Sequence, residues 1–270
     1  MNQTESSSLY SDLDQMSTLD LLQGINTEDR KIPDIVAGCI PQIIPLVDGI
    51  VERMQKGGRV FYLGAGTSGR LGITDASEIL PTYGLDGAFF GIIAGGDRAI
   101  RRAVEGAEDA PLQGWKDLLP YAPTAEDTLI GITASGGAPY VVGAIEEAKK
   151  IGMLTGCITC NEGTAVARAC DCPIIAVVGP EFVTGSTRMK AGTATKLILN
   201  MISTSTMIRL GHVKGNRMVD MQLTNKKLVD RGTRMIMEEA GITDYAFARE
   251  KLLTYGSVRA ALEALRNEAL

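Results

Sequence analysis

The sequence lacks any uninterrupted apolar stretch of about 20 residues, the length that a membrane-spanning helix needs. The nearest stretch, TKLILNMISTSTMIRL, is broken by Asn200 and by several hydroxyl side chains. The polar and acidic N-terminus, MNQTESSSLYSDLDQ, also lacks the basic region and apolar run of a signal peptide. We therefore expect a cytoplasmic protein that makes no contact with a membrane.

Positive charge is also scarce, and the formal net charge is −5. This balance argues against nucleic-acid binding, which usually requires a basic face. It does not exclude an anionic small molecule, which needs only a local convergence of positive groups. The 270 residues, 45% hydrophobic and 22% charged, are typical of a soluble globular protein with a substantial core.

Histidine and cysteine are too few or too irregularly spaced to indicate a metal site or a disulfide framework. Five cysteines are an odd count in a long chain, which is not typical of a secreted disulfide scaffold. Four of them lie in CITCNEGTAVARACDC, where the second pair is C-x-C and the separation departs from that of zinc ribbons. We expect the first pair in a buried strand. The single His212 follows Gly211 at an expected helix end, where a capping or surface role is favoured.

Alternating strand and helix patterns organise the middle of the chain. The first twenty residues are expected to be poorly ordered, with Ser17 or Thr18 capping a short helix, and residues 33–56 are expected to be helical. Strands are predicted at 59–64, 88–95, 127–135, 154–160 and 173–179. They are almost continuously apolar, as in parallel sheets covered on both faces. The pattern predicts an α/β fold with a doubly wound parallel sheet of about five strands, which binds ligands at the carboxyl ends of its strands.

After residue 190 the pattern is wholly helical. Residues 190–210 are apolar nearly all round, so this helix is expected to be buried or to pack against a partner subunit. Further helices are predicted at 218–240 and 242–268. We therefore divide the chain into an N-terminal tail with helices (1–56), a sheet domain (57–213) and a C-terminal helical region (214–270).

Three loops that follow strands are rich in glycine and hydroxyl side chains: GAGTSGR, ASGGAPY and VTGSTRMKAGT. Backbone N–H groups at helix N-termini attract anions, and Ser and Thr add donors without bulk. One such loop alone is often only a turn or a cap. Three at the same edge of one predicted sheet indicate a phosphate with a polar body, which is a sugar phosphate.

The first loop also fits the dinucleotide fingerprint, with glycines at 64, 66 and 69. That interpretation needs an acidic residue about 20 positions on, at the end of the second strand. Asp97 comes later than expected and stands behind two glycines. The dinucleotide interpretation is therefore disfavoured.

Four stretches, YLGAGTSGRLGITDASE, AGGDRAIRRAVEGAED, ITASGGAPY and VTGSTRMKAGTATKLILNM, closely resemble the N-acetylmuramic acid 6-phosphate etherases. These are bacterial enzymes built on the sugar isomerase (SIS) domain, and the resemblance covers nearly the whole chain. The related glucokinase regulatory proteins share parts of these motifs. The resemblance implies cleavage of the lactyl ether of N-acetylmuramic acid 6-phosphate to N-acetylglucosamine 6-phosphate and D-lactate. It is also consistent with a homodimer.

The implied chemistry requires two carboxyl groups and neither a metal ion nor a redox cofactor. By the family pattern, Glu78 is the acid that protonates the departing lactyl oxygen, and Glu108 is the base that removes the carbon 2 proton. From the residues alone, Glu78 could be an exposed carboxylate at a helix end. Glu108, with Glu105 and Asp109 beside it, could belong to a solvated acidic face. Glu105 is the main alternative to Glu108.

The resemblance also assigns residues to the sugar phosphate. SIS-domain similarity places the phosphate at the second loop, with Ser68 reaching across and cations supplied by the first and third loops. The implied substrate-binding residues are Gly66, Thr67, Ser68, Arg70, Thr133, Ser135, Gly136, Ser186, Arg188 and Lys190. For Lys190, a capping or salt-bridged role near a helix start is an equal alternative.

Two stretches depart from the usual family pattern. The chain has EILPT where the family usually has ECPPT, and ASGGAPY where it usually has ASGRTPY. Gly137 and Ala138 therefore remove an arginine and a hydroxyl beside the phosphate loop, which puts the phosphate affinity in question. Two other functions stay open: a non-catalytic sugar-phosphate sensor that regulates a kinase, and an aldose–ketose isomerase. The sensor would not need Glu78 and Glu108, and the isomerase would need no acid for a leaving ether.

Overall fold

The computed structural model describes residues 2–223 and 225–268, which form two compact units. The first, called the sheet unit, holds the residues up to Ala76 and Ala88–Thr206. The second, called the helical unit, holds Ser77–Gly87 and the residues from Met207 onward. The three-part division at residues 56 and 213 stays a prediction.

Short 3-10 helices, α-helices and strands follow one another along the chain. In order, the elements are η1 (Gln3–Glu5), η2 (Leu13–Gln15), α1 (Thr18–Asp29), α2 (Ile32–Gln55), β1 (Val60–Gly64), α3 (Gly66–Ser77), α4 (Ile79–Tyr83), β2 (Phe89–Ile93), α5 (Asp97–Arg101), η3 (Ala107–Asp109), α6 (Gln113–Leu118), η4 (Leu119–Tyr121), β3 (Thr128–Ile132), α7 (Pro139–Lys150), β4 (Leu154–Thr159), α8 (Ala165–Ala169), β5 (Cys172–Ile175), α9 (Lys190–Arg209), β6 (Val213–Lys214), β7 (Arg217–Met218), α10 (Lys226–Ala240), α11 (Tyr245–Tyr255) and α12 (Val258–Glu268).

Five parallel strands in the order β2-β1-β3-β4-β5 form the sheet, which confirms the predicted doubly wound α/β fold. From β1 the chain moves outward to β2, whereas from β3 it moves the other way to β4 and β5. The topological switch point therefore lies between β1 and β3. Open α/β sheets bind ligands in the crevice at the carboxyl ends of the strands beside this point.

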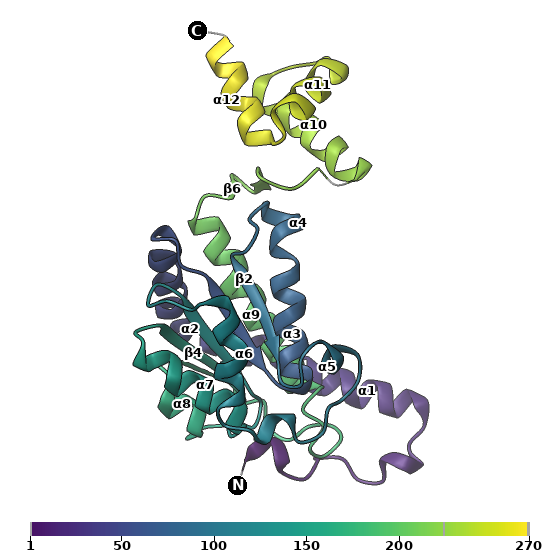
Figure 1. The fold of residues 1–270 in the computed structure, drawn as a ribbon. Coiled ribbons are helices and arrows are strands. Elements are labelled where there is room, and N and C mark those ends of the chain that lie inside the picture. The colour runs from purple at the N-terminus through teal and green to yellow at the C-terminus, as the bar shows by residue number, and fades with distance from the viewer. Residues whose placement is uncertain (1, 224, 269–270) are drawn as a thin grey trace. The chain divides into compact units, whose positions relative to one another are not determined.

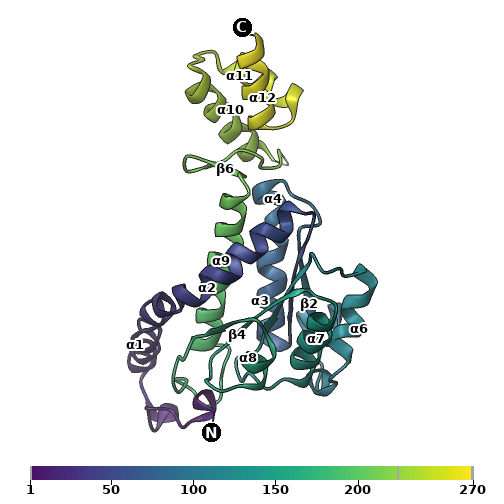
Figure 2. The same ribbon diagram turned by 90° about the vertical axis from the view of Figure 1, so that its left-hand side faces the viewer.

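Helices cover both faces of the sheet, as the almost fully buried strands require (Figures 1 and 2). Helices α6, α7 and α8 lie on one face, and α2, α3 and α9 lie on the other. Close packing on the first face needs Gly131, because a Cβ there would lie 2.5 Å from Val141 of α7. On the second face, Gly156 makes room for Leu46 of α2 in the same way. The core on the α7 side is centred on Phe61, Leu63 and Leu129.

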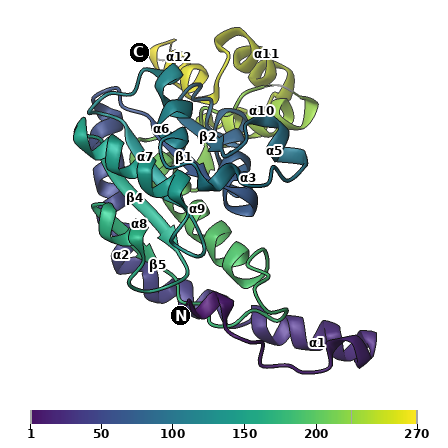
Figure 3. The same ribbon diagram turned by 60° about the horizontal axis from the view of Figure 1, so that its bottom comes forward.

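The N-terminal segment is ordered against the sheet unit, so the expectation of disorder is wrong for residues 2–10 (Figure 3). Thr4 is fully buried and exchanges hydrogen bonds with Asn161. Ser17, one of two predicted capping residues, accepts a hydrogen bond from the N–H of Asp20 and begins α1. The first half of α1 then projects from the sheet unit, as Figures 2 and 3 show.

Among the residues that the structure describes, one helical stretch, Thr18–Gln55, is long and apolar enough to cross a membrane by length and composition alone. The sequence had pointed instead to the apolar residues of α9. Helix α2 provides most of this stretch, and eight of its residues are buried against the rest of the sheet unit: Ile32, Val36, Cys39, Ile43, Leu46, Val47, Ile50 and Val51. Core helices of soluble proteins pass the same test, and α2 packs on β4 and β5.

The helical unit has a core of its own, formed mainly by α10, α11 and α12 around Ile236 and Leu252. A short antiparallel hairpin, β6–β7, precedes these helices. It corrects the prediction that the chain is wholly helical after residue 190. His212, beside this hairpin, places Nδ1 3.0 Å from the Asp220 carboxylate, which also accepts from Arg259. His212 therefore belongs to a hydrogen-bonded cluster within this unit.

Candidate functional site

A pocket of about 370 Å³ lies at the carboxyl ends of the strands in the sheet unit, on both sides of the switch point. Loops after β1, β2 and β3, the start of α9 and one N-terminal residue line it. Its lining residues are Glu5, Ala65, Gly66, Thr67, Ser68, Arg70, Ala94, Ala99, Ala103, Val104, Glu105, Gly106, Ala107, Glu108, Ile132, Thr133, Ala134, Ser135, Ala138, Thr187, Ala191, Gly192 and Thr195. The position agrees with the sequence-based expectation of a site at this edge.

The loop after β1 brings the first helical turn of α3 to the pocket. A Cβ at Gly64 would lie 2.8 Å from the nitrogen of Gly69, and one at Gly69 would lie 2.7 Å from the oxygen of Gly64. These two glycines therefore allow α3 to start directly against β1. Gly66, with φ of +53°, faces open space at the helix start. The first N–H groups of α3, beside Thr67 and Ser68, have no intrahelical partner and suit an anion.

The loop after β3 supplies a second set of donors. Thr133 Oγ1 lies 3.4 Å from Ser135 Oγ and accepts from the N–H of Gly136. Gly136 has φ of +74°, and a Cβ there would lie 2.3 Å from Thr164. The backbone of Gly136 also accepts from Val166 of α8, which holds the loop in place. Thr133 and Ser135 line the pocket, and Gly136 shapes the turn behind them.

The third predicted loop reaches the pocket through different residues from those predicted. Thr187 and Thr195 line the pocket, together with Ala191 and Gly192. The predicted residues Ser186, Arg188 and Lys190 are not among the lining residues.

Lys190 instead forms a buried ion pair. Its side chain is 3% exposed, and Nζ lies 2.7 Å from Oε2 of Glu28. Burial raises the pKa of the Glu28 carboxyl, but hydrogen bonds from Lys190 and Lys31 lower it by more, so the net pKa is below its ordinary value. The salt-bridged role that the sequence left open for Lys190 matches this position.

Three glutamates, Glu5, Glu105 and Glu108, are among the lining residues of the pocket. Glu108 lies in η3, and both Glu105 and Glu108 are exposed. Both predicted candidates for the base are therefore in the pocket. Glu78, the predicted acid, is exposed at the N-cap of α4, in the helical unit, and is not among the lining residues of this pocket.

Arg70 is the cation among the lining residues, and its guanidinium is already engaged. Nη2 donates to the carbonyl of Ala99 at 2.8 Å, and Nε donates to that of Ile100 at 2.9 Å. These hydrogen bonds connect α3 to α5, the helix that precedes the loop with Glu105 and Glu108. Arg70 therefore contributes positive charge to the pocket while it holds this wall in place.

The cysteines contribute no ligand set. Within residues 2–223 and 225–268, no group of three or more His, Cys, Asp or Glu side chains is arranged to hold a metal ion. Cys157 lies in β4, as predicted, and is fully buried with Cys160 close behind. Burial raises the pKa of Cys160 to about 12, which keeps it a thiol.

The chain matches two family descriptions within the sheet unit. Residues 42–149 match the glucokinase regulatory protein N-terminal SIS domain, and residues 120–205 match the SIS domain. A phosphoheptose isomerase from Francisella tularensis has a similar structure, with a TM-score of 0.54 and 21% identity over 72% of this chain and all of that one. A phosphoheptose isomerase from Neisseria gonorrhoeae gives a TM-score of 0.52 and 15% identity over 70% of this chain and 98% of that one. At these identities the likeness establishes the SIS fold.

Curated relatives match almost the entire chain. A Porphyromonas gingivalis protein named N-acetylmuramic acid 6-phosphate etherase is 58% identical over 98% of this chain and 97% of its own length. Proteins with the same name from Bacteroides thetaiotaomicron and Caldanaerobacter subterraneus are 57% and 51% identical, over 97% and 93% of this chain and 95% and 82% of their own lengths. The chain therefore belongs to the N-acetylmuramic acid 6-phosphate etherase family.

Proposed function

We propose that this protein cleaves the D-lactyl ether of N-acetylmuramic acid 6-phosphate and releases N-acetylglucosamine 6-phosphate and D-lactate. The observation that carries the proposal is the identity of 51–58% to proteins named for this activity, which extends through both units of the chain. The pocket supports it, because serine and threonine residues and three glutamates line it at the carboxyl edge of the sheet.

In the proposed reaction, two carboxyl groups perform the proton transfers. In the open-chain aldehyde, the carbonyl acidifies the proton on carbon 2, and Glu108 removes it. The electron pair forms the double bond between carbons 2 and 3 as the carbon 3–oxygen bond breaks. Glu78 is not among the lining residues of the pocket, and its proposed role, to give its proton to the departing lactyl oxygen, rests on the family pattern. Water then adds its hydroxyl to carbon 3 and a proton to carbon 2, which yields the product sugar.

The phosphate is proposed to bind between the loops after β1 and β3. Ser68, Thr133 and Ser135 present hydroxyl donors there, and the first N–H groups of α3 add a helix N-terminus. Gly66 and Thr67 line this part of the pocket, and Gly136, which is not a lining residue, shapes the turn behind it. Gly137 and Ala138 stand where the family usually has an arginine and a threonine, and their side chains offer the phosphate no donor. The phosphate is therefore proposed to bind through these hydroxyl and backbone donors.

The third predicted loop, VTGSTRMKAGT, contributes other residues to the proposed site than those predicted from the sequence. Ser186 and Arg188 are not among the lining residues, but they flank Thr187, which does line the pocket. Lys190, whose ammonium is paired with Glu28 at 2.7 Å, is proposed to hold the start of α9. Thr187 and Thr195 are added as hydroxyl contacts for the sugar.

A homodimer is part of the proposal. The first half of α1 projects from the sheet unit and exposes Leu19 and Leu22, which are 63% and 61% accessible (Figure 3). Ile40 and Ile44 of α2 are also exposed. A second copy of the chain would cover these apolar side chains. Light scattering on the wild-type protein and on Ile44→Glu tests this: we expect a dimer that the charged substitution weakens.

We place the reaction in the cytoplasm, in the recycling of peptidoglycan. N-acetylmuramic acid is a sugar of the bacterial cell wall, and its phosphorylated form is retained inside the cell by its charge. The reaction converts it into an ordinary amino-sugar phosphate for carbohydrate metabolism. Fractionation of cells that produce the protein, with detection of the chain in each fraction, tests the location.

The decisive experiment assays D-lactate after the protein is incubated with N-acetylmuramic acid 6-phosphate. We expect release by the wild type and by Glu250→Gln, a matched change of an exposed carboxylate on α11, and none by Glu78→Gln. A wild type that binds the sugar phosphate but releases no lactate would support the kinase-regulating sensor. Conversion to a ketose phosphate without lactate would support the isomerase.

A further inference from the structure

A short N-terminal segment, residues 2–10, lies against the loops that follow β3, β4 and β5 and joins two of the pocket loops. At its start, the Asn2 side-chain amide donates to the carbonyl of Ser135 at 3.2 Å. Further on, the N–H of Ser8 donates to Thr184 Oγ1 at 2.9 Å, and Ser8 Oγ donates to the carbonyl of Phe182 at 2.7 Å. We call residues 2–10 the N-terminal strap, because they bridge the loop after β3 and the loop before α9.

Thr4 is the anchor of the strap. Its side chain is fully buried, its N–H donates to Asn161 Oδ1 at 3.2 Å, and its hydroxyl accepts from Asn161 Nδ2 at 2.9 Å. Asn161 is itself 2% exposed and also donates to the carbonyl of Ala134 in the phosphate loop. The position of residue 4 is therefore coupled to the backbone of the pocket.

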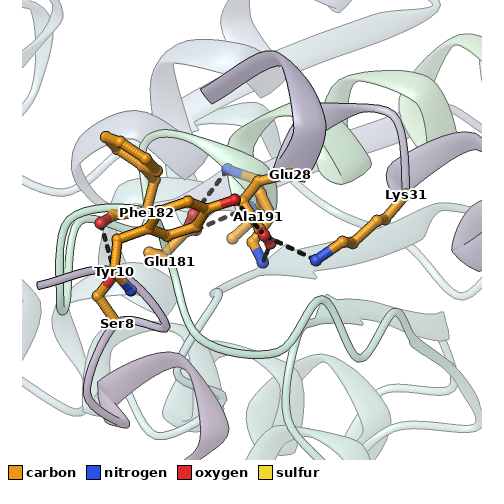
Figure 4. Close-up of polar contacts among 8 residues, drawn as sticks. Ser8, Tyr10, Glu28, Lys31, Glu181, Phe182 and Ala191 are labelled. Carbon is orange, nitrogen blue, oxygen red and sulfur yellow. Dashed lines mark hydrogen bonds and ion pairs between the residues drawn. The ribbon is translucent and has the colours of Figure 1, made fainter. Parts of the chain in front are cut away.

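The other end of the strap is held by the buried network shown in Figure 4. The ring of Tyr10 packs on that of Phe182, with centroids 4.7 Å apart, and its hydroxyl donates to Glu28 at 3.2 Å. Glu28 pairs with Lys190, and the carboxylate of Glu181 accepts from the N–H groups that start α9. Both ends of the strap are thus fixed on elements that also line the pocket.

Between these anchors, Glu5 lines the pocket. Its carboxylate makes no hydrogen bond or ion pair with any of the residues that the structure describes. Its Oε2 would lie 3.3 Å from a Cβ at Gly185, the glycine of the third loop, so a larger side chain there would crowd it. The strap therefore presents an unengaged hydrogen-bond acceptor to the space in which the substrate is proposed to bind.

We propose that Glu5 is a specificity-determining residue that accepts hydrogen bonds from hydroxyl or amide groups of the sugar. The proposal rests on the proposed function. An ionised carboxylate is only an acceptor. It cannot hold the phosphate or the lactyl carboxylate of the substrate, which carry the same charge. The donors that such a substrate offers are its sugar hydroxyls and its acetamido N–H, and Glu5 suits these.

The test compares Glu5→Ala with Ser7→Ala, an exposed position on the same strap with no hydrogen bond to the described residues. Calorimetry measures the Kd for N-acetylglucosamine 6-phosphate and for inorganic phosphate, and the lactate assay measures KM and kcat. For Glu5→Ala we expect the sugar-phosphate Kd and the KM to rise about ten- to a hundredfold, because the variant loses a hydrogen bond to a charged group. The phosphate Kd is expected to stay unchanged, and Ser7→Ala is expected to match the wild type in every value.

Two results would overturn the proposal. One is an unchanged sugar-phosphate Kd in Glu5→Ala. The other is tighter binding of both ligands in this variant, which would mean that Glu5 only repels anions. Failure of the proposed function is a separate observation, since it appears as a wild type that releases no D-lactate. The calorimetric comparison needs no turnover and decides the role of Glu5 in either case.

A double-mutant cycle tests the part played by the anchor. Thr4→Val keeps the shape of the side chain but removes the hydroxyl that accepts from Asn161. If Thr4 acts by positioning Glu5, Thr4→Val weakens sugar-phosphate binding in the wild type and has no further effect in Glu5→Ala. Equal effects in both backgrounds would show that Thr4 acts on the pocket without Glu5. The melting temperature of each variant, measured alongside, identifies any general loss of stability.

Discussion

The buried pair of Lys190 and Glu28 gives the sharpest prediction for stability. Both side chains are almost inaccessible, at 3% and 4%, and the two atoms of the pair lie 2.7 Å apart. In Lys190→Met, Glu28 keeps Lys31 and Tyr10 as partners, but Lys31 is half exposed. Removal of one member of a buried pair costs about 3–5 kcal/mol, and the remaining partners place this change at the lower end, about 3 kcal/mol.

Urea unfolding followed by the fluorescence of Trp115 measures this change. The single tryptophan lies in α6, so it reports on the sheet unit. With an m-value of about 3 kcal/mol per M, a loss of about 3 kcal/mol lowers the midpoint by about 1 M. The double variant Glu28→Gln/Lys190→Met should recover part of the loss, because it leaves no unpaired charge. If Lys190→Met unfolds at the same urea concentration as the wild type, the reasoning is refuted.

The pH dependence of the same pair follows from the lowered pKa of Glu28. A carboxyl whose pKa is lower in the folded state contributes stability above its ordinary value of 4.5 and loses it as the pH falls through the folded value. The midpoint difference between the wild type and Lys190→Met should therefore be full at neutral pH. It should shrink below pH 4.5 as Glu28 is protonated. A difference that grows on acidification would contradict this assignment.

The remaining predictions concern the pocket. Glu108→Gln should abolish lactate release, whereas Glu105→Gln should reduce it less, and the reverse order would transfer the role of base to Glu105. Ser135→Ala should raise the KM for N-acetylmuramic acid 6-phosphate about one to two orders of magnitude, because a hydrogen bond to a charged group contributes about 1.5–3 kcal/mol. The binding of unphosphorylated N-acetylmuramic acid should barely change in this variant. Dialysis against a strong chelator should leave the turnover unchanged, since proton transfers alone suffice, and recovery of a lost activity by added zinc would speak against this mechanism.

Strand positions could be predicted well because the sheet is buried on both faces. The run AFFGIIAG, for example, contains β2, and VFYLG is β1. The predicted ends extend too far where an apolar run continues into a loop. Strand β5 ends at Ile175, although the apolar run reaches Val178, because the ladder with its neighbour β4 ends at the pair of Thr159 and Ile175. Hydrophobicity indicates burial, but the extent of a strand depends on the partner it pairs with.

The location of the pocket could also be predicted, but not every side chain that faces it. Loop composition identified the segment before α9. Which residues point inward depends on the rotation of that helix, which directs Ala191 and Thr195 to the pocket and Lys190 to Glu28. Glu5 had no local signal, because its position depends on the contact of Thr4 with Asn161, far away in the chain.

The N-terminal strap has a consequence for the order in which the protein folds during synthesis. Its partners Asn161, Phe182 and Thr184 follow it by more than 150 residues. At about 5–20 residues per second, the ribosome needs roughly 8–35 s to produce them after the strap has been made. The loop-closure cost grows only slowly with such separations, so late docking is thermodynamically feasible. The strap is thus among the last segments to be placed, and nascent chains should acquire full affinity for the sugar only after Thr195, which lines the pocket, has emerged.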